Sequence, residues 1–285
     1  MHMLSALGGL REIKAAAEAF DRLDPNPAAA VSWFEETPTR FRLVVYAETL
    51  QDAASARAMI GHAAPELPVA EEEAPDADWV AHALDGLPAV KAGRFIVAGA
   101  HALSASRSGL KKIWIEASEA FGTGHHGSTK GCLIALEHIL RTRRIKRVLD
   151  VGAGSGVLAI AAAKMGASAY GIEIDPRAAR IGEVNVRQNN VRGRVRMRAG
   201  DGARLTGRGR YDLAFANILM RPLIALAPTL SRAVEPGGNL VLSGLLHSQA
   251  PLVKAAYASR GFVLERRLRL DAWTTLIWRR KRQRA

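Results

Sequence analysis

The residues most able to do chemistry surround a run of three alternating glycines, Gly152, Gly154 and Gly156. The run follows an apolar segment that contains Asp150, and it leads directly into an apolar helical pattern. Glycines at this spacing let backbone N–H groups approach a ligand and let the following helix pack closely on the preceding strand. Seventeen residues after the last glycine, Glu173 ends a second apolar segment, where a carboxylate can accept both hydroxyls of a ribose. The pattern predicts a nucleoside-binding pocket at the carboxyl edge of a parallel sheet.

The glycine spacing distinguishes two kinds of nucleoside site. Dinucleotide sites typically space their glycines as G-x-G-x-x-G, so that a helix N-terminus can hold a pyrophosphate. Here the spacing is G-x-G-x-G, preceded by Asp150, and no phosphate ligand is evident in the sequence. The segment resembles the first motif of the class I S-adenosylmethionine-dependent methyltransferases, whose cofactor has no phosphate and carries a sulfonium cation. A dehydrogenase is a distant alternative, disfavoured by the glycine spacing and by the absence of a catalytic pair.

A glycine-containing loop, the end of a later strand and a loop aspartate supply further candidate site residues. The glycine-punctuated loop at residues 119–129 runs into a helix and suggests a lid, in which Phe121 covers the cofactor and Thr129 offers a hydroxyl. The hydroxyl of Thr129 could instead cap that helix. Asn217 ends a strand, where its carbonyl could accept a hydrogen bond from an attacking amine, although a turn asparagine is the alternative reading. Asp201 follows another strand and could face an adenine amino group or simply be solvated.

Neither a metal site nor a disulfide framework is expected. The single cysteine, Cys132, lies in an apolar helical pattern and should be a buried small hydrophobe. Neighbouring loop residues such as His125 and His126 rarely converge on one ion, and no carboxylate or cysteine is spaced to join them. No apolar stretch approaches the ~20 residues that span a bilayer, and no signal-peptide pattern starts the chain. We therefore expect a cytoplasmic monomer without a membrane partner.

The formal net charge of +13 is unusual for an enzyme that acts on small molecules. Much of the excess lies in residues 141–147, 187–210 and 279–284. Such charge can neutralise phosphates and bring a protein into electrostatic contact with ribosomal RNA. A solvated basic surface is the alternative, because cations at a helix end and in a frayed tail need no ligand.

The 285 residues, of which 48% are hydrophobic, suffice for two cores. A helical pattern, a strand at residues 40–47 and a second helical pattern at residues 51–62 predict a small α+β domain over residues 1–74. The acidic segment at residues 68–76 contains two prolines and predicts a linker, followed by a linker helix within residues 75–88.

Residues 89–285 alternate between strand and helix patterns, which predicts an α/β domain with a mostly parallel, Rossmann-like sheet. The last two strands should form an antiparallel hairpin. Predicted strands span residues 94–98, 112–116, 147–151, 169–174, 195–198, 211–216, 238–243, 262–270 and 274–279, and a turn is expected at residues 235–238. Predicted helices span residues 128–141, 157–165, 176–190, 220–234 and 248–259.

Taken together, these segments resemble the PrmA family, the methyltransferases of ribosomal large-subunit protein 11. The resemblance covers roughly residue 89 to the C-terminus. It is carried by residues 120–124 with His126 and Thr129, 149–152 with 154–156, 171–176, 216–219 with Pro222 and Leu223, and 243–246 with Gln249. It implies S-adenosylmethionine contacts at Thr129, Gly152, Glu173 and Asn217, and an N-terminal substrate-recognition domain on a mobile linker. It also implies methylation of lysine side-chain and N-terminal α-amino groups on that ribosomal protein.

The sequence departs from the family pattern at a few positions. Ala153 stands where a cysteine is common, residues 127–128 replace a Pro-Thr pair, and Glu173 replaces the usual aspartate. Residues 116–118 also depart from an Asp-Pro-Gly pattern. Two other functions remain open, namely methylation of ribosomal RNA and a non-catalytic module that binds ribosomes or RNA.

Overall fold

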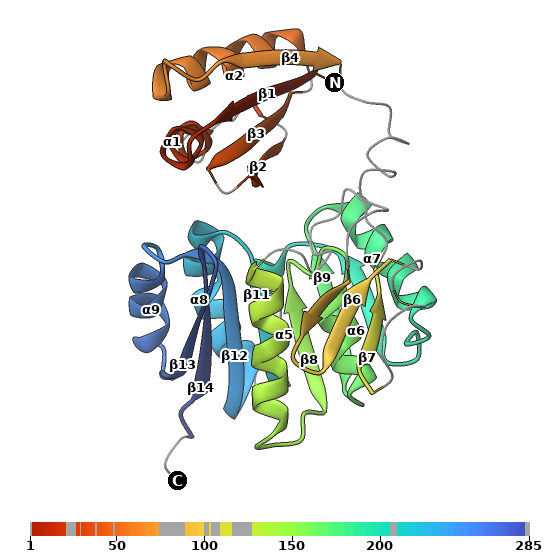
Figure 1. The fold of residues 1–285 in the computed structure, drawn as a ribbon. Helices are drawn as coiled ribbons and strands as arrows, with labels where there is room; N and C mark the ends of the chain where they lie inside the picture. Colours follow the sequence, from red (N-terminus) through yellow and green to blue (C-terminus); the bar gives the residue numbers. More distant parts are fainter. Residues whose placement is uncertain are drawn as a thin grey trace. The chain divides into compact units, whose positions relative to one another are not determined.

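The computed structural model describes residues 2–20, 27–28, 30–37, 39–47, 49–73, 89–99, 103, 109–115, 127–205 and 210–282. The chain divides into two compact units, Met1–Val80 and Ala81–Ala285 (Figure 1). The predicted linker helix lies outside the described residues. Among the described helices, none combines the length and the apolar character needed to cross a lipid bilayer.

The described residues of the N-terminal unit form a four-stranded antiparallel sheet with two helices on one face. Its elements are β1 (His2–Gly8), α1 (Leu10–Phe20), β2 (Ala30–Thr37), β3 (Arg40–Ala47), α2 (Leu50–Ala63) and β4 (Val69–Glu73). The strand order is β2-β3-β1-β4. Ile13, Ala16 and Phe20 follow helical spacing in α1 and are buried against the sheet together with Leu43 and Val45 of β3. The predicted strand at 40–47 and helix at 51–62 are both confirmed.

Strand β4 corrects the prediction of a linker at residues 68–76. Three successive glutamates in this segment are typical of a solvent-exposed linker. The structure instead places them in a strand that pairs in antiparallel register with β1. Val69 packs against the core of the unit, while Glu71 forms an ion pair with Arg57 at 3.3 Å. Val69 and Glu71 are two positions apart and lie on the same face of this edge strand, where the glutamate is paired.

The second unit is built on a seven-stranded sheet in the order β10-β9-β8-β11-β12-β14-β13. Its strands are β8 (Arg147–Val151), β9 (Ser168–Glu173), β10 (Val195–Ala199), β11 (Tyr211–Asn217), β12 (Val234–Leu246), β13 (Phe262–Leu270) and β14 (Trp273–Arg280). The pairs from β10 to β12 are parallel, whereas β14 pairs antiparallel with both β12 and β13. The predicted α/β fold with a C-terminal antiparallel hairpin is confirmed.

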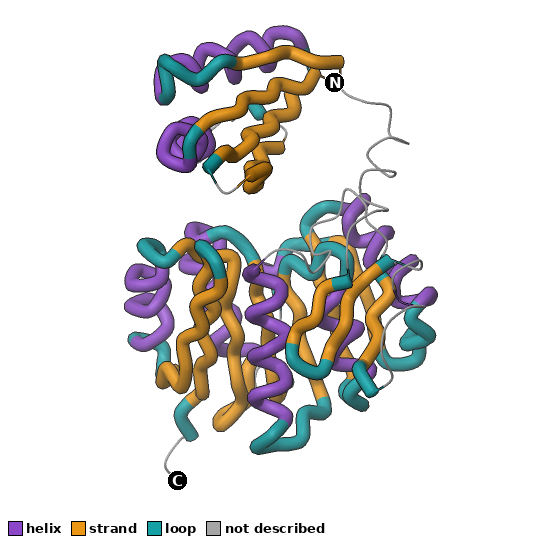
Figure 2. The backbone as a smooth tube through the Cα atoms, viewed as in Figure 1, coloured by secondary structure: helices purple, strands orange, loops and turns teal. Residues whose placement is uncertain are grey.

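Helices cover both faces of this sheet (Figure 2). They are α5 (Gly127–Leu140), α6 (Val157–Lys164), α7 (Pro176–Gln188), α8 (Met220–Ala233) and α9 (Ala250–Ala258). Helices α5, α6 and α7 contribute to one core and helices α8 and α9 to the other. Cys132 of α5 is fully buried in the first core, as predicted, and burial raises the pKa of its thiol.

The predicted strands at 94–98 and 112–116 lie in a separate small sheet rather than in the large one. Strands β5 (Val90–Ala92), β6 (Phe95–Ala98) and β7 (Lys111–Trp114) form this sheet in sequence order. Phe95 and Ile113 are fully buried in the core that contains α5 and α6. The prediction of strands is therefore correct, but these strands pack over α5 and α6 instead of joining the large sheet.

Strand β12 begins earlier than predicted, because the expected turn at 235–238 lies within it. The β11–β12 ladder pairs Tyr211 with Val234 and then Leu213 with Asn239. The intervening residues of β12 leave the ladder as a bulge, where Gly237 has a φ of 79°. The turn residues thus bend the strand without ending it.

Candidate cofactor-binding and catalytic site

The glycine loop joins β8 to α6 at the carboxyl edge of the sheet. Gly152, Gly154 and Gly156 have φ angles of 68°, 49° and 77°, which side-chain-bearing residues rarely adopt. A Cβ atom on Gly152 would also collide with the side chain of Ile218. The N–H groups of Gly152 and Ala153 donate to the carbonyl of Ile172 in β9, at 2.9 and 3.2 Å. Local conformation and close packing therefore both require glycine at this loop.

Glu173 is held against the glycine loop by the pairing of β8 with β9. Its Oε2 accepts a hydrogen bond from the N–H of Gly154 at 2.8 Å. Its Oε1 accepts one from the N–H of Asp175 at 3.2 Å. A carboxylate has about four acceptor positions, so Glu173 retains capacity for the hydroxyls of a ribose.

Asn185 of α7 anchors the loop from below and was not predicted as a site residue. Its side-chain amide donates to the carbonyl of Ser155 at 2.9 Å, and it is almost fully buried. On the same helix, Gly182 lies so close to the loop that a Cβ atom would come within 2.9 Å of the Gly154 carbonyl. A buried asparagine among the apolar positions of an amphipathic helix was the available signal.

Asp150 lies beneath the loop with only 1% of its surface exposed. Its Oδ2 accepts a hydrogen bond from the N–H of Ala159 at 3.1 Å, which ties β8 to the first turns of α6. Its Oδ1 has no hydrogen-bond partner among the described residues. Burial raises the pKa of Asp150 to about 7, opposed by the Ala159 hydrogen bond and reinforced by the charge of Glu173.

Asn217 and Thr129 meet at the carboxyl end of β11. The Asn217 Nδ2 donates to the Thr129 Oγ1 at 3.3 Å, while the Asn217 Oδ1 is buried without a partner among the described residues. Thr129 is fully buried in the first turn of α5, where its hydroxyl faces Asn217. The unpaired oxygen is a hydrogen-bond acceptor of the kind that an amine substrate requires.

The first turn of α5 is fixed by strands from the C-terminal part of the chain. Ser243 of β12 donates from its hydroxyl to the carbonyl of Ser128 at 3.2 Å. The same hydroxyl lies 2.7 Å from the Thr275 hydroxyl of β14. These buried contacts hold Thr129 opposite Asn217.

The other candidate residues predicted from the sequence are not brought into contact with Asn217 or Glu173 in the described part of the structure. Asp201 caps the short helix Gly202–Arg204, since its Oδ1 accepts from the N–H of Ala203 at 2.8 Å. A contact between Asp201 and an adenine stays a prediction. Phe121, His125 and His126 lie outside the described residues. Among the residues that are described, no group of three or more His, Cys, Asp or Glu side chains could hold a metal ion.

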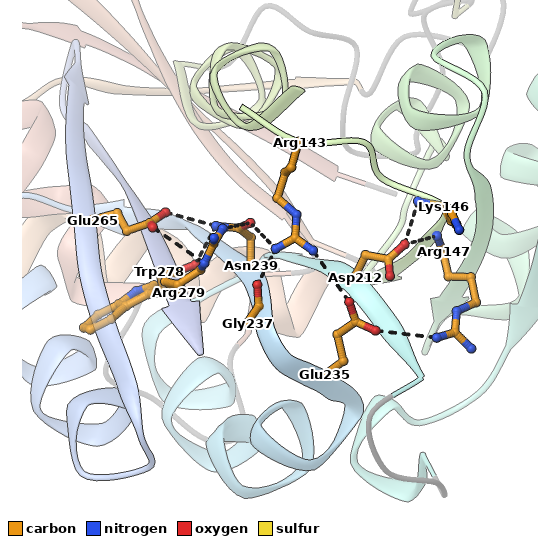
Figure 3. A network of polar contacts seen from close by, with 10 residues as sticks. All are labelled: Arg143, Lys146, Arg147, Asp212, Glu235, Gly237, Asn239, Glu265, Trp278 and Arg279. Carbon is orange, nitrogen blue, oxygen red and sulfur yellow. Dashed lines mark hydrogen bonds and ion pairs between the residues drawn. The ribbon is translucent and has the colours of Figure 1, made fainter. Parts of the chain in front are cut away.

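A second polar cluster lies at the opposite, amino edge of the sheet (Figure 3). Asp212 accepts hydrogen bonds from the N–H groups of Lys146 and Arg147, at 2.6 and 2.8 Å. Although burial raises the pKa of Asp212, these hydrogen bonds lower it below its usual value. Burial and a hydrogen bond with Asp212 raise the pKa of Glu235, which pairs with Arg143 and Arg147 at 3.6 Å each. The cluster joins the start of β8 to β11 and β12, far along the strands from the glycine loop.

The carboxyl-edge site fits S-adenosylmethionine better than a dinucleotide. Two buried acceptor oxygens, on Asp150 and Asn217, have no partner among the described residues. The carboxylate beneath the loop and the amide oxygen beside it suit a neighbouring positive charge and N–H donors, and no cationic side chain of the described residues hydrogen-bonds to Glu173. The glycine loop, Glu173 and Thr129 would hold such a cofactor.

Comparisons with known proteins agree with this geometry. A model of the ribosomal protein L11 methyltransferase family (PrmA) matches residues 14–281. A ribosomal protein L11 methyltransferase of Caulobacter sp. (strain K31) is 44% identical over 280 residues, which cover 96% of each chain. Another from Bradyrhizobium diazoefficiens is 41% identical over 263 residues, or 88% of each chain. The crystal structure of a ribosomal protein L11 methylase from Lactobacillus delbrueckii subsp. bulgaricus matches with a TM-score of 0.61 and 26% identity, covering 68% of this chain and all of the other.

Proposed function

Because the chain belongs to the ribosomal protein L11 methyltransferase family, we propose that it methylates amino groups of ribosomal protein L11. S-Adenosylmethionine is the methyl donor. The acceptors are lysine side chains and the N-terminal α-amino group, and the enzyme acts as a cytoplasmic monomer. The buried Oδ1 of Asn217, beside the glycine loop and without a partner among the described residues, is the observation that most favours an amine acceptor.

Asn217 orients the amine in this proposal. When bound, S-adenosylmethionine supplies an electrophilic methyl group on a sulfonium. An amine attacks only through its free lone pair, so one N–H must be held while the lone pair faces the methyl carbon. The Asn217 Oδ1 accepts that N–H, and the hydrogen bond to Thr129 keeps the amide from rotating. Alignment of this kind can contribute ~7–11 kcal/mol to catalysis.

The amine must also lose a proton, because a lysine with a pKa of about 10.4 is mostly protonated at neutral pH. Among the described residues, the hydrogen-bond partner of the Asn217 side chain is Thr129, a neutral hydroxyl and not a base. Desolvation of the lysine beside the buried Oδ1 of Asn217 lowers the pKa of the lysine and favours the neutral amine. His126, outside the described residues, is the candidate base that the sequence offers.

The N-terminal unit is proposed to recognise the protein substrate. Both of its described helices bury the same face of its sheet, against Leu4, Leu43 and Val45. Side chains alternate along a strand, so Tyr46 and its cross-strand neighbour Met3 lie on the opposite face. Both are only partly buried, and this face is the one that we propose contacts the substrate.

Radiolabelled methyl transfer tests the proposed function. Ribosomal proteins and ribosomal RNA from a strain that lacks the enzyme would be incubated with the purified protein and labelled S-adenosylmethionine. Label in L11, mapped to lysine or to the N-terminal amine, is expected. Label in RNA alone would keep the fold and cofactor but refute the protein substrate. Cofactor binding without label in either fraction would refute the proposed acceptor as well.

A further inference from the structure

Strand β10 forms one edge of the large sheet and carries an unusual concentration of arginine. No acidic residue lies between Glu183 and Asp201. The arginines in this interval are Arg187, Arg192, Arg194, Arg196 and Arg198. Val195 and Met197 of the strand are buried in the core with α6 and α7. Alternation therefore places Arg196 and Arg198 on the other face of the sheet. Arg194 lies in the turn just before the strand, where its Nη1 donates to the carbonyl of Gly166 at 3.0 Å. We call these three residues the arginine stripe (Arg194, Arg196 and Arg198).

The register of the sheet extends this basic surface onto the neighbouring strands. Arg196 lies opposite Tyr170 of β9, and Arg198 lies opposite Ile172. One row earlier, Ser168 of β9 pairs with Arg147 of β8. Positions two apart on a strand are ~6.6 Å apart, and positions two strands apart are ~10 Å apart. The stripe and Arg147 thus mark out a cationic field with Tyr170, which is partly exposed, in its middle.

A surface depression adjoins this field at the amino edge of the sheet. It is lined by Arg143, Arg144, Lys146, Arg147, Ser168, Asp212 and Glu235, most of which Figure 3 shows. Its two carboxylates are already engaged, Asp212 by backbone N–H groups and Glu235 by two arginines. They therefore leave much of the surrounding positive charge uncompensated.

Several of these cations have no acidic partner. Within the described part of the chain, Arg144, Lys146, Arg196 and Arg198 form no ion pair, and all four are exposed. The ion pairs that the protein does form there are made by Arg143 and Arg147 with Glu235. Exposed, regularly spaced cations without partners are suited to a ligand that carries repeated negative charge.

We propose that the arginine stripe and the adjoining depression bind the sugar–phosphate backbone of RNA. Single-stranded nucleic acids bind where a cationic track follows the backbone and aromatic side chains receive bases, a combination that Arg196 and Tyr170 provide in one row. An acidic protein segment would use the same charge but has no need of the aromatic residue. The depression lies at the amino edge of the sheet, at the other end of the strands from the glycine loop. The inference does not depend on which amine the enzyme methylates.

The other edge strand supplies a matched control. Arg266, Arg267 and Arg269 of β13 are also exposed on an edge of the same sheet. Charged edge strands are a common protection against unwanted strand pairing, and that role would need no ligand. Replacing three arginines on either edge lowers the net charge equally, so any difference in RNA binding reports position and not total charge.

Fluorescence anisotropy of a labelled oligouridylate of about 20 nucleotides, a length above the usual single-domain footprint, tests the proposal. We expect Arg194→Gln/Arg196→Gln/Arg198→Gln to weaken binding by the full-length protein at least about tenfold at low salt. The slope of log K against log salt should fall by about 2, because each lost phosphate contact removes ~0.7 for a single strand. The matched β13 variant, Arg266→Gln/Arg267→Gln/Arg269→Gln, should keep the wild-type slope. If the triple β10 variant loses stability, Arg196→Gln alone should lower the slope by ~0.7.

Equal losses in the two triple variants would show a bulk charge effect and overturn the proposal. So would an absence of RNA binding by the wild type, or competition by poly-L-glutamate that matches RNA at equal charge. Methylation of free L11 is measured in parallel and should be unchanged in both triple variants. Failure of L11 methylation in the wild type would refute the proposed function while leaving the RNA result intact.

Discussion

The side-chain amide of Asn217 donates a hydrogen bond to the hydroxyl of Thr129 across 88 positions of sequence. One residue ends a central strand and the other begins the helix that packs over the sheet. The contact leaves the carbonyl oxygen of Asn217 unpaired among the described residues, so the helix dictates which end of the amide is offered to a substrate.

Replacement of Asn217 by alanine should reduce turnover much more than it reduces cofactor affinity. The variant lacks the acceptor that aligns the amine, and misalignment of a reacting group can cost about 100-fold in rate. Single-turnover methylation of L11 and calorimetric binding of S-adenosylmethionine measure the two quantities. Equal losses in both would assign Asn217 to cofactor binding instead.

Thr129→Val should produce a weaker version of the same defect. Valine has nearly the same shape but removes the oxygen that receives the Asn217 amide, leaving a buried donor unpaired. We expect a loss in kcat of about tenfold, corresponding to one hydrogen bond of ~1–1.5 kcal/mol. Thr129→Ser keeps the hydroxyl and should restore most of the rate. If serine fails as badly as valine, the methyl group of Thr129 matters and the hydrogen bond does not.

Gly152→Ala should abolish cofactor binding and destabilise the second unit. Its φ of 68° disfavours alanine, and the new Cβ would collide with Ile218. Left-handed backbone strain of this kind costs ~1–3 kcal/mol before the collision is counted. Gly61→Ala is the control, because this helical position in α2 has nothing within 4 Å of the added Cβ. It should stabilise its helix by ~0.5–1 kcal/mol and leave cofactor binding unaltered.

The buried carboxyl of Asp150 predicts a particular dependence of stability on pH. Its pKa is raised to about 7, so between pH ~4 and ~7 the folded protein keeps a proton that the unfolded chain releases. This group therefore makes the protein less stable as pH rises through that window. Asp150→Asn removes the titration and keeps an acceptor for the Ala159 N–H.

Urea unfolding of wild type and Asp150→Asn across this pH range tests the assignment. The free energy of unfolding of the variant, relative to wild type, should increase with pH by up to about 1.4 kcal/mol per unit. Above the folded pKa the difference should become constant. A difference that does not change between the two ends of the range would mean that Asp150 is ionised throughout.

Asp212→Ala should destabilise the second unit by ~2–3 kcal/mol, because it leaves two backbone N–H groups at the start of β8 without their charged acceptor. Asp212→Asn keeps one acceptor oxygen and should lose about half as much. Arg204→Ala removes an exposed ion pair with Asp201 at 3.7 Å and should cost only ~0–1 kcal/mol. Urea unfolding midpoints of the three variants measure the predicted order of destabilisation. A loss of stability in Asp212→Ala no larger than that in Arg204→Ala would contradict the prediction.

Sequence patterns predicted the elements that carry strong local signals. The bounds of β8 and β13 are the predicted ones, and the helices of the large unit begin and end within two residues of the predictions. Apolar runs bounded by glycine define both kinds of element. Weak signals failed in the N-terminal unit, where β1, β2 and β4 have polar or mixed sequences and are strands because their neighbours pair with them.

The site itself could be predicted only in part for the same reason. Gly152 and Glu173 could be predicted because the sequence itself indicates them. A left-handed backbone conformation requires glycine, and a polar residue directly after an apolar run indicates the end of a strand. The pairing of Asn217 with Thr129, and the anchoring of the loop by Asn185, depend on contacts between distant segments. The position of Asn185 on the apolar face of α7 indicates burial, but it does not indicate which loop the side chain holds.

The insertion of β14 between β12 and β13 has a consequence for the order in which the protein is made. Ribosomes synthesise chains from the N-terminus, so every residue that lines the glycine loop emerges well before Thr275. Yet Thr275 completes the contact with Ser243 that fixes the first turn of α5. A nascent chain should therefore acquire a loop able to hold the cofactor before it acquires an aligned Asn217, and become active only once β14 has been inserted.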